Sequence, residues 1–220
     1  MSSGWWRNAA ARLIEALKDV IYGLLVILAA AVVYPLFRLR VYGRRNLKGG
    51  GILVARHRSY WDIPLICVAC GPRYRVNFIA RRGLLRNPLF APFVWGFATV
   101  IDREHFGPDD YKRTIRAARR SHILGIFPEG TTRPGARPRT GAVRLAELLR
   151  KPLIPVNILP KGPYPPKKFP PRYPRVTVHI GAPIPLEELA RGLPEGTKRT
   201  ERYRLLTHRL MEIIDSTSVH

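Results

Sequence analysis

The feature that most constrains this chain is a run of 18 residues without a charge, from Val20 to Phe37. A helix of this length is close to the shortest that crosses the hydrocarbon part of a bilayer. Before the run, apolar residues are mixed with arginine and lysine, a pattern typical of a helix that lies in a membrane interface. Residues 1–37 are therefore predicted to be an amphipathic and hydrophobic membrane anchor, and residues 38–220 a folded domain.

Three placements of this run remain open. Gly23 and Pro35 interrupt it, so it fits a helix that spans the bilayer, a helix inserted into one leaflet, or a core helix of a soluble domain. The residues that follow are strongly basic: Arg38, Arg40, Arg44, Arg45 and Lys48. Because positive flanks stay inside, we expect the folded domain on the cytoplasmic face of the cell inner (plasma) membrane.

The charge of the chain predicts an anionic partner. Lys and Arg number 38 against 15 Asp and Glu, a formal net charge of +23. Nucleic acid, an anionic membrane surface and phosphorylated substrates all fit this charge. The basic residues are spread along the chain and form no finger or recognition-helix motif, so no specific nucleic acid is expected. A basic protein that binds nucleic acid or a membrane surface without catalysis is the competing class.

The two cysteines, Cys67 and Cys70, lie three apart in the apolar segment 63–70. The C-x-x-C spacing also occurs in redox sites, but the apolar context favours packing. A zinc site needs a second pair of ligands, and none is spaced for it. The sequence also lacks the fingerprints of nucleotide-binding loops. We therefore expect no metal and no cofactor, and the sequence leaves the oligomeric state undecided.

Apolar periodicity predicts that strands and helices alternate after residue 39. Strands are expected at residues 52–55, 76–80, 97–101, 123–127, 153–159 and 175–180. Helices are expected at residues 62–70, 109–121, 142–149 and 200–215, with an extended proline-rich loop at 160–174. Alternation of this kind predicts an α/β layered fold, whose sites lie at the carboxyl ends of the strands.

A histidine and an aspartate flank the turn after the first predicted strand. His57 follows the strand directly, and Asp62 stands where the next helix begins. Two residues five apart lie on different faces of one regular helix, but a turn from strand to helix can bring them together. Asp62 would then hold one ring nitrogen and stabilise the imidazolium. The other nitrogen would take a proton from a hydroxyl, as a general base.

The spacing alone is weak evidence. His105 and Asp110 repeat it in a segment that we interpret as a surface turn. Ser59 and Asp62 also fit the start of a helix that has Pro64 in its first turn. For the first motif, taken by itself, a helix cap and a catalytic pair both remain open.

A second segment, Phe127 to Arg133, has the sequence FPEGTTR and follows a short buried strand. Gly130 allows close approach of the backbone, and the turn can present N–H groups to an anion. The hydroxyl of Thr131 and the guanidinium of Arg133 suit phosphate oxygens. Glu129 can accept a hydrogen bond from a polyol hydroxyl. Standing alone, the heptapeptide also fits an ordinary solvated turn.

Together the two motifs resemble those of the glycerolipid acyltransferase family, and most closely its bacterial lysophosphatidic acid acyltransferases. Residues 57–62 match the family's H-x4-D block, and residues 127–133 match its F-P-E-G-T-x-R block. Residues 96–103 resemble the second block, in which the last arginine, here Arg103, contacts the substrate phosphate. Residues 153–156 are similar to the fourth, an apolar block with a proline. All four occur in the family's order.

The resemblance implies an α/β fold, a mixed sheet flanked by helices, with an N-terminal helical membrane anchor. It implies that a fatty acyl group moves from acyl-CoA or acyl carrier protein (acyl-ACP) to the sn-2 hydroxyl of 1-acyl-glycerol-3-phosphate, which gives phosphatidic acid in phospholipid biosynthesis. The expected partners are therefore this lysophospholipid, the thioester donor and an anionic membrane surface. Acylation of another lysophospholipid or lipid acceptor remains open.

One departure from the family concerns the stretch before the second block. The family often has a lysine and an acidic residue there, whereas this chain has Arg81, Arg82 and Gly83. Arg81 or Arg82 can serve as the cation that faces the substrate phosphate, as a planar fork rather than a point charge. Gly83 removes the acid, so an ion pair of the family is not expected here.

Overall fold

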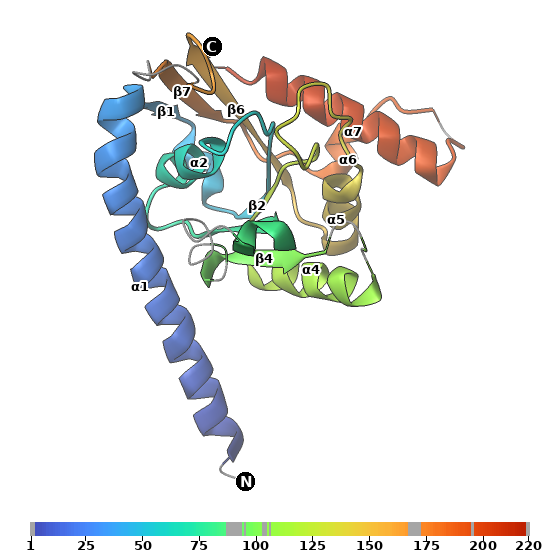
Figure 1. Cartoon of the computed structure of the whole chain (residues 1–220). Helices are drawn as coiled ribbons and strands as arrows, with labels where there is room; N and C mark the ends of the chain where they lie inside the picture. The colour runs from blue at the N-terminus through green and yellow to red at the C-terminus, as the bar shows by residue number, and fades with distance from the viewer. Residues whose placement is uncertain are drawn as a thin grey trace.

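The computed structural model describes residues 3–86, 94, 96–102, 105, 107–166, 173–194 and 196–218. Within these residues the centre of the fold is a seven-stranded sheet with the order β1-β7-β6-β2-β5-β3-β4 (Figure 1). The strands are β1 (Arg40–Tyr42), β2 (Gly51–Ala55), β3 (Val76–Arg81), β4 (Ala98–Ile101), β5 (Ile123–Ile126), β6 (Leu153–Lys161) and β7 (Arg175–Ile180).

The sheet is mixed, because β6 and β7 pair antiparallel while the other neighbours are parallel. β2 lies between β5 and β6, and all five of its residues are buried. Parallel strands covered on both faces are continuous apolar runs, which is what Ile52–Ala55 shows in the sequence. The carboxyl ends of β2, β5, β3 and β4 lie at one edge of the sheet, and the loops that leave them form the candidate site.

Helices cover both faces of the sheet. They are α1 (Ser3–Phe37), α2 (Asp62–Cys70), α4 (Pro108–Arg120), α5 (Gly141–Leu149), α6 (Leu186–Leu189) and α7 (Arg199–Ser216), with 3-10 turns η1 (Arg44–Leu47) and η2 (Arg82–Arg86). One apolar core joins α1 and α2 to the sheet, and a second joins α4, α5 and α7 to its other face. Leu53 and Ala55 of β2 belong to the first core and Ile52 and Val54 to the second, as alternation along a strand requires.

The sequence predicts most of these elements to within two residues. It does not predict β1, which pairs with β7 from within the basic segment that follows the anchor. The strand predicted at residues 153–159 is two residues too short, because β6 continues to Lys161, into the predicted proline-rich loop. Residues 167–172 of that loop lie outside the described residues.

The N-terminal segment forms a single helix, α1, instead of an interfacial helix followed by a separate apolar one. Its Arg12–Phe37 stretch is long and apolar enough to cross a membrane, and it alone passes this test among the described residues. Only 22% of its apolar window is buried, less than a core helix of a soluble domain requires. Tyr22, Val26, Val33 and Phe37 face the first core.

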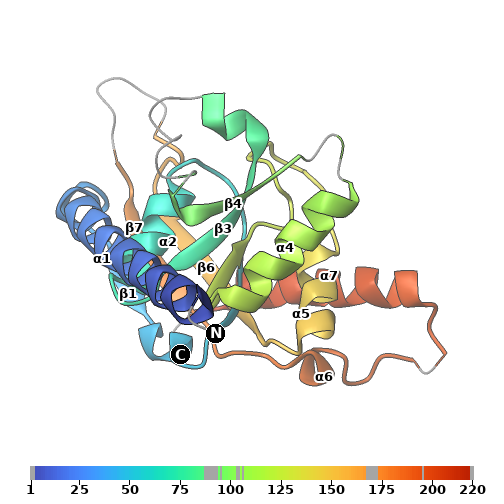
Figure 2. The same cartoon turned by 90° about the horizontal axis from the view of Figure 1, so that it is seen from below.

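The C-terminal part of α1 packs beside α2, and its N-terminal part extends beyond the rest of the domain (Figure 1 and Figure 2). Further toward its N-terminus, Glu15 and Asp19 form ion pairs with Arg75, at 2.6 and 2.9 Å. Contacts from Glu15 to Phe37 extend over roughly 33 Å of helix, at about 1.5 Å per residue. Its outward face is apolar and exposed: Leu13, Ile14, Leu17, Val20, Leu24, Ile27, Leu28 and Val32.

The structure confirms the prediction that the two cysteines are packing residues. Cys67 and Cys70 are free, lie on α2 and belong to the first core. Burial raises the pKa of both thiols, so neither is a ready thiolate near neutral pH.

Candidate active site

His57 lies two residues after the end of β2, at the carboxyl edge of the sheet. Its Nδ1 lies 3.1 Å from Oδ2 of Asp62, which is the first residue of α2. The turn from strand to helix therefore brings the two side chains together, although they are five residues apart. Asp62 is fully buried, and the side chain of His57 is 13% exposed. In the part of the chain that the structure describes, Nε2 of His57 has no hydrogen-bond partner, so it is available to a substrate.

The carboxylate of Asp62 is held by several donors. Its Oδ2 also accepts hydrogen bonds from the backbone N–H groups of Arg58 (2.6 Å) and Ser59 (2.8 Å). Its other oxygen, Oδ1, accepts one from the hydroxyl of Tyr164 at 2.5 Å. A buried carboxylate needs such donors because nothing else replaces its hydration. They fix its orientation, so Asp62 can hold His57 in the tautomer with the proton on Nδ1.

Tyr164 is a site residue that the sequence does not reveal. It follows β6, in the segment predicted only as a proline-rich loop, and 102 residues separate it from Asp62. Burial and the neighbouring Asp62 charge raise the pKa of Tyr164, so the phenol keeps its proton and acts as a donor. The two tyrosines of this segment, Tyr164 and Tyr173, were its one signal, and nothing in the sequence indicated which of them contacts Asp62.

Besides its contact with Asp62, the imidazole of His57 is held by stacked aromatic rings. Phe127 lies against His57, with centroids 4.3 Å apart and planes 18° apart, and Phe78 stacks on Phe127 at 5.4 Å. Gly125 leaves room for this arrangement, because a Cβ there would lie 2.5 Å from the Phe78 ring. The first residue of the FPEGTTR segment therefore packs against the histidine of the other motif.

Glu129 also connects the two motifs. Its Oε2 accepts a hydrogen bond from the backbone N–H of His57 at 2.8 Å, and its Oε1 pairs with Arg56 at 2.7 Å. Both carboxylate oxygens are therefore engaged inside the protein, in a contact different from the expected one with a substrate hydroxyl. The expected contact stays a prediction, and the second lone pair of each oxygen can accept it without loss of either bond.

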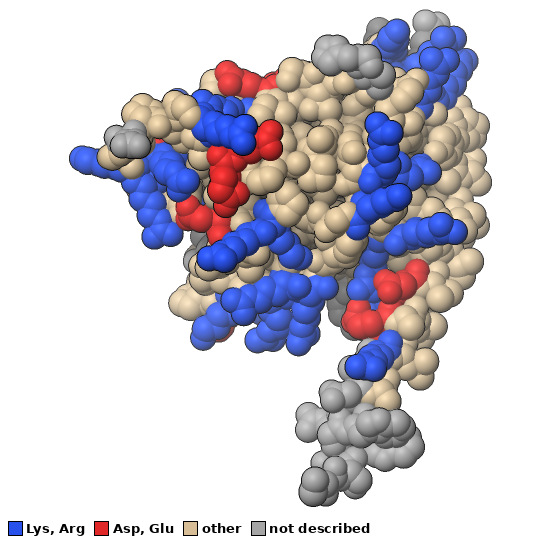
Figure 3. Space-filling model, turned by 180° about the vertical axis from the view of Figure 1, so that it is seen from behind, with Lys and Arg blue, Asp and Glu red and all other residues tan. Residues whose placement is uncertain are grey.

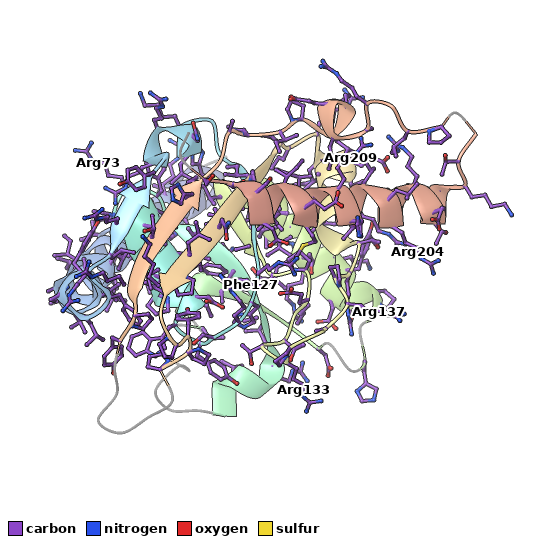
Figure 4. The ribbon with its side chains drawn as sticks, turned by 90° about the horizontal axis from the view of Figure 1, so that it is seen from above. Arg73, Phe127, Arg133, Arg137, Arg204 and Arg209 are labelled. Atoms are coloured by element: carbon purple, nitrogen blue, oxygen red, sulfur yellow. The ribbon has the colours of Figure 1, made fainter. Side chains whose placement is uncertain are left out.

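The rest of the FPEGTTR segment turns toward the surface. Gly130 has a φ of 66°, a left-handed conformation that favours glycine, and its N–H donates to the carbonyl of Phe127. The hydroxyl of Thr131 accepts the backbone N–H of Arg133 at 3.3 Å. The side chain of Arg133 is exposed, and Figure 4 shows Arg133 and Arg137 at the rim of the molecule, pointing away from Phe127.

The structure does not describe the side chains of the remaining predicted phosphate-binding residues, Arg81 and Arg103. Arg103 lies outside the described residues, and of Arg81 only the backbone is described, as the last residue of β3. The contacts of both with a phosphate stay predictions. The second H-x4-D spacing was predicted as surface structure, which holds for His105 but not for Asp110, which is buried at 8% exposure. The side chain of His105 is 87% exposed, while Asp110 accepts the N–H of Asp102 and pairs with Arg113.

A cavity of about 280 Å³ lies next to this edge, on the face that α4 and α5 cover. Its lining is mostly apolar and includes Ile79, Ile101, Ile126, Phe127 and Leu145, with Arg139 and Arg144 among the polar residues. Figure 3, which views the molecule from behind, shows Lys and Arg in several groups, with smaller acidic groups beside some of them. Within the described residues, no three His, Cys, Asp or Glu side chains could hold a metal ion.

The family of the chain follows from comparison with known proteins. A family model described as Acyltransferase matches residues 38–159, more than half of the chain. The chain belongs to this family. The match contains both members of the His57–Asp62 pair and the FPEGTTR segment, and it confirms the resemblance that these motifs indicated.

Two curated relatives of this acyltransferase-family chain are named 1-acyl-sn-glycerol-3-phosphate acyltransferase. The protein from Bacillus subtilis is 31% identical over 121 residues, 53% of this chain and 60% of the relative. The protein from Streptococcus pneumoniae is 30% identical over 147 residues, 66% of this chain and 54% of the relative. The matched part of the chain thus spans less than two thirds of either relative.

A solved structure confirms the fold class. The crystal structure of the 1-acyl-sn-glycerophosphate (LPA) acyltransferase PlsC from Thermotoga maritima has a TM-score of 0.54 to this chain. The alignment covers 92% of this chain and 100% of that chain, at 19% identity. The predicted mixed α/β sheet flanked by helices is therefore the fold of this acyltransferase-family member.

Proposed function

We propose that this protein transfers a fatty acyl group from an acyl thioester to the sn-2 hydroxyl of 1-acyl-glycerol-3-phosphate, which yields phosphatidic acid. The observation that carries the proposal is the His57–Asp62 pair, at 3.1 Å, at the end of a buried strand in a chain of the Acyltransferase family. The names of both curated relatives support the choice of acceptor. The donor is acyl-CoA or acyl-ACP.

In the proposed mechanism, Nε2 of His57 removes the proton of the acceptor hydroxyl as its oxygen attacks the thioester carbonyl. Asp62 stabilises the imidazolium that forms, and its hydrogen bond to Nδ1 keeps the ring in place. When the tetrahedral intermediate collapses, the carbon–sulfur bond breaks, and the imidazolium returns the proton to the leaving thiolate. The products are an ester and a free thiol, and the histidine is regenerated.

The acceptor phosphate is assigned to cationic side chains at the rim of the site. Arg133 is exposed and lies on the same turn as Glu129, which contacts the backbone of His57. A guanidinium there would bind the phosphate and hold the hydroxyl near Nε2, which is the entropic part of catalysis. The apolar cavity beside Phe127 has the polarity that an acyl chain requires.

Membrane association is assigned to the outward face of α1. Its opposite face packs on the domain over much of its length, so the helix cannot cross a bilayer without taking part of the domain with it. We therefore favour a helix that lies in one leaflet, with Leu17, Leu24 and Leu28 among the acyl chains. The domain then lies at the surface of the membrane that supplies the acceptor, with the cytoplasmic face of the inner membrane as its expected side.

The test is acyl transfer by His57→Ala, measured with lysophosphatidic acid and labelled acyl-CoA. We expect turnover to fall by at least about a hundredfold, since a general base contributes roughly 10²–10⁴-fold. His105→Ala is the matched control, because it alters the exposed histidine of the second H-x4-D spacing and should leave turnover unchanged. Wild-type protein that makes no phosphatidic acid from either donor would reject the function. Substantial turnover by His57→Ala would reject the base.

A further inference from the structure

The C-terminal end of α7 is connected to the catalytic turn by a chain of ion pairs. Asp215 binds Arg56 through two bonds, from Nε to Oδ1 and from Nη2 to Oδ2, each 2.5 Å long. The third nitrogen of the same guanidinium, Nη1, pairs with Oε1 of Glu129 at 2.7 Å. The other oxygen of Glu129 accepts the backbone N–H of His57. Each step of this chain uses a different atom, so the four residues form one continuous network.

We propose that Asp215 and Arg56 are positioning residues, which set the place of His57 in the active site through Glu129. The activity readout of this inference rests on the proposed function. None of the motifs in the sequence includes Asp215, which is 159 residues from Arg56.

The acidic end of the network is itself fixed to the sheet. Asn157 on β6 is 6% exposed, and its side-chain amide donates to the backbone carbonyls of Asp215 (3.0 Å) and Thr217 (3.2 Å). Its neighbour Val156 is paired with Ala55, the residue before Arg56. Figure 1 shows this end of α7 beside β6 and β7. Asp215 is therefore anchored to β6, the strand next to β2, and β2 leads into the turn that holds His57.

The network differs from an ordinary ion pair at a protein surface. Isolated exposed pairs contribute little, because each ion remains well solvated. Asp215 is 51% exposed, but Arg56 is 33% exposed and Glu129 11%, and the fork of Arg56 is filled on both sides. The hydrogen bonds that Arg56 donates to Asp215 and Glu129 raise the pKa of its guanidinium despite partial burial, so the group keeps its charge.

The consequence for catalysis follows from what Arg56 would do without Asp215. Two of its nitrogens would turn to water, and the guanidinium would be free to rotate with Glu129 as its one remaining acidic partner among the described residues. Glu129 would then follow the arginine and leave the N–H of His57. The imidazole would lose its fixed position between Asp62 and Phe127, and near-attack geometry would become less frequent.

The test compares Asp215→Asn with Glu212→Gln. Glu212 lies one turn earlier on α7, is exposed, and pairs only with His208 among the described residues, so its variant removes a carboxylate without touching Arg56. We expect Asp215→Asn to lower kcat about tenfold, the upper range of effects carried through such networks, with KM for lysophosphatidic acid changed less than twofold. Glu212→Gln should match wild type, and Asp215→Glu should recover part of the loss.

A double-mutant cycle separates positioning from general damage to α7. If Asp215 acts through Glu129, then Asp215→Asn should have little further effect in a Glu129→Gln background. Additive effects on kcat would overturn the proposal, as would an equal loss in Glu212→Gln. A raised KM with unchanged kcat would also overturn it, because Asp215 would then support binding of the acceptor and not the position of His57.

Deuterium exchange of the His57 N–H needs no substrate, so it tests the positioning role independently of the proposed function. The backbone N–H of His57 should exchange with deuterium faster in Asp215→Asn than in wild type, because its acceptor Glu129 is released. Glu212→Gln should leave this exchange unchanged. Equal exchange in all three proteins would overturn the positioning role, whichever acyl acceptor the enzyme uses.

Discussion

The hydroxyl of Tyr164 offers the sharpest test of how the buried Asp62 is held. In the substitution Tyr164→Phe the ring remains and only the oxygen that donates to Oδ1 at 2.5 Å is lost. Asp62 is fully buried, so water does not readily replace this donor. The three remaining bonds, from His57 and from the N–H groups of residues 58 and 59, all reach the other oxygen.

The expected loss of stability follows from these contacts. A hydrogen bond to a charged group contributes about 1.5–3 kcal/mol, and Oδ1 is left without its donor. For a chain of this length, each kcal/mol shifts the melting temperature by roughly 2–4 °C, so Tm should fall by about 3–12 °C. Turnover should fall as well, since a carboxylate with one unsatisfied oxygen holds the imidazole in more than one orientation.

The effect should depend on pH in a defined direction. Burial and the Asp62 charge raise the pKa of Tyr164 above its ordinary value of 10.0, so folding favours the protonated phenol. Its contribution to stability is therefore complete below pH 10 and is lost as the pH rises from there toward the folded-state pKa. The stability difference between wild type and Tyr164→Phe should be largest at neutral pH and should shrink above pH 10.

The assay is thermal unfolding of the detergent-solubilised protein at pH 8 and above pH 10, with acyl transfer measured at pH 8. Tyr173→Phe is the matched control. Tyr173 packs against Phe37 and Trp61, and its hydroxyl has no hydrogen bond among the described residues. Equal melting temperatures for wild type and Tyr164→Phe would refute the role given to this bond. So would an equal loss in the Tyr173 variant.

Two further predictions concern the acceptor and the membrane. Arg133→Ala should lower kcat/KM for lysophosphatidic acid about tenfold or more, because a charged hydrogen bond is lost, and should leave kcat/KM for a non-phosphorylated monoacylglycerol unchanged. Arg137→Ala serves for comparison. Equal losses of kcat/KM with both acceptors would contradict phosphate binding. Leu24→Glu with Leu28→Glu should weaken binding to anionic vesicles about a hundredfold, at about 1.5 kcal/mol for each leucine. Leu148→Glu, an exposed leucine on α5, should not, and unchanged binding of the double variant would move the membrane contact elsewhere.

Helix α1 is part of the folded domain, so substitutions on its outward face test membrane binding better than its deletion. From sequence alone, residues 1–37 are predicted as a membrane anchor beside a separate domain. In the structure, Tyr22, Val26, Val33 and Phe37 are buried against the domain. Removal of the helix would uncover this part of the core, so a truncated protein would report on folding as much as on anchoring. The sequence shows that the segment is apolar, but which of its faces packs is a property of the folded domain.

Local pattern explains why so much of the fold was predictable. The strands β2 and β5 and the helix α2 are short apolar segments bounded by turn residues, and such segments are visible in a linear sequence. β1 was missed because a strand of three residues is too short to carry a periodic signal, and its pairing with β7 stabilises it. The same reasoning applies to the end of β6, which continues because β7 pairs with it.

The sequence by itself determined the family motifs and the chemistry they can support: an imidazole and a carboxylate five residues apart, and a turn with a glycine and an arginine. Only the tertiary structure decided that Phe127 stacks on His57, that Glu129 turns inward, and that Tyr164 and Asp215 belong to the site. The physical reason is that hydrogen bonds and ion pairs act between atoms within about 3 Å. Residues separated by 102 or 159 positions come that close only through the order of the strands.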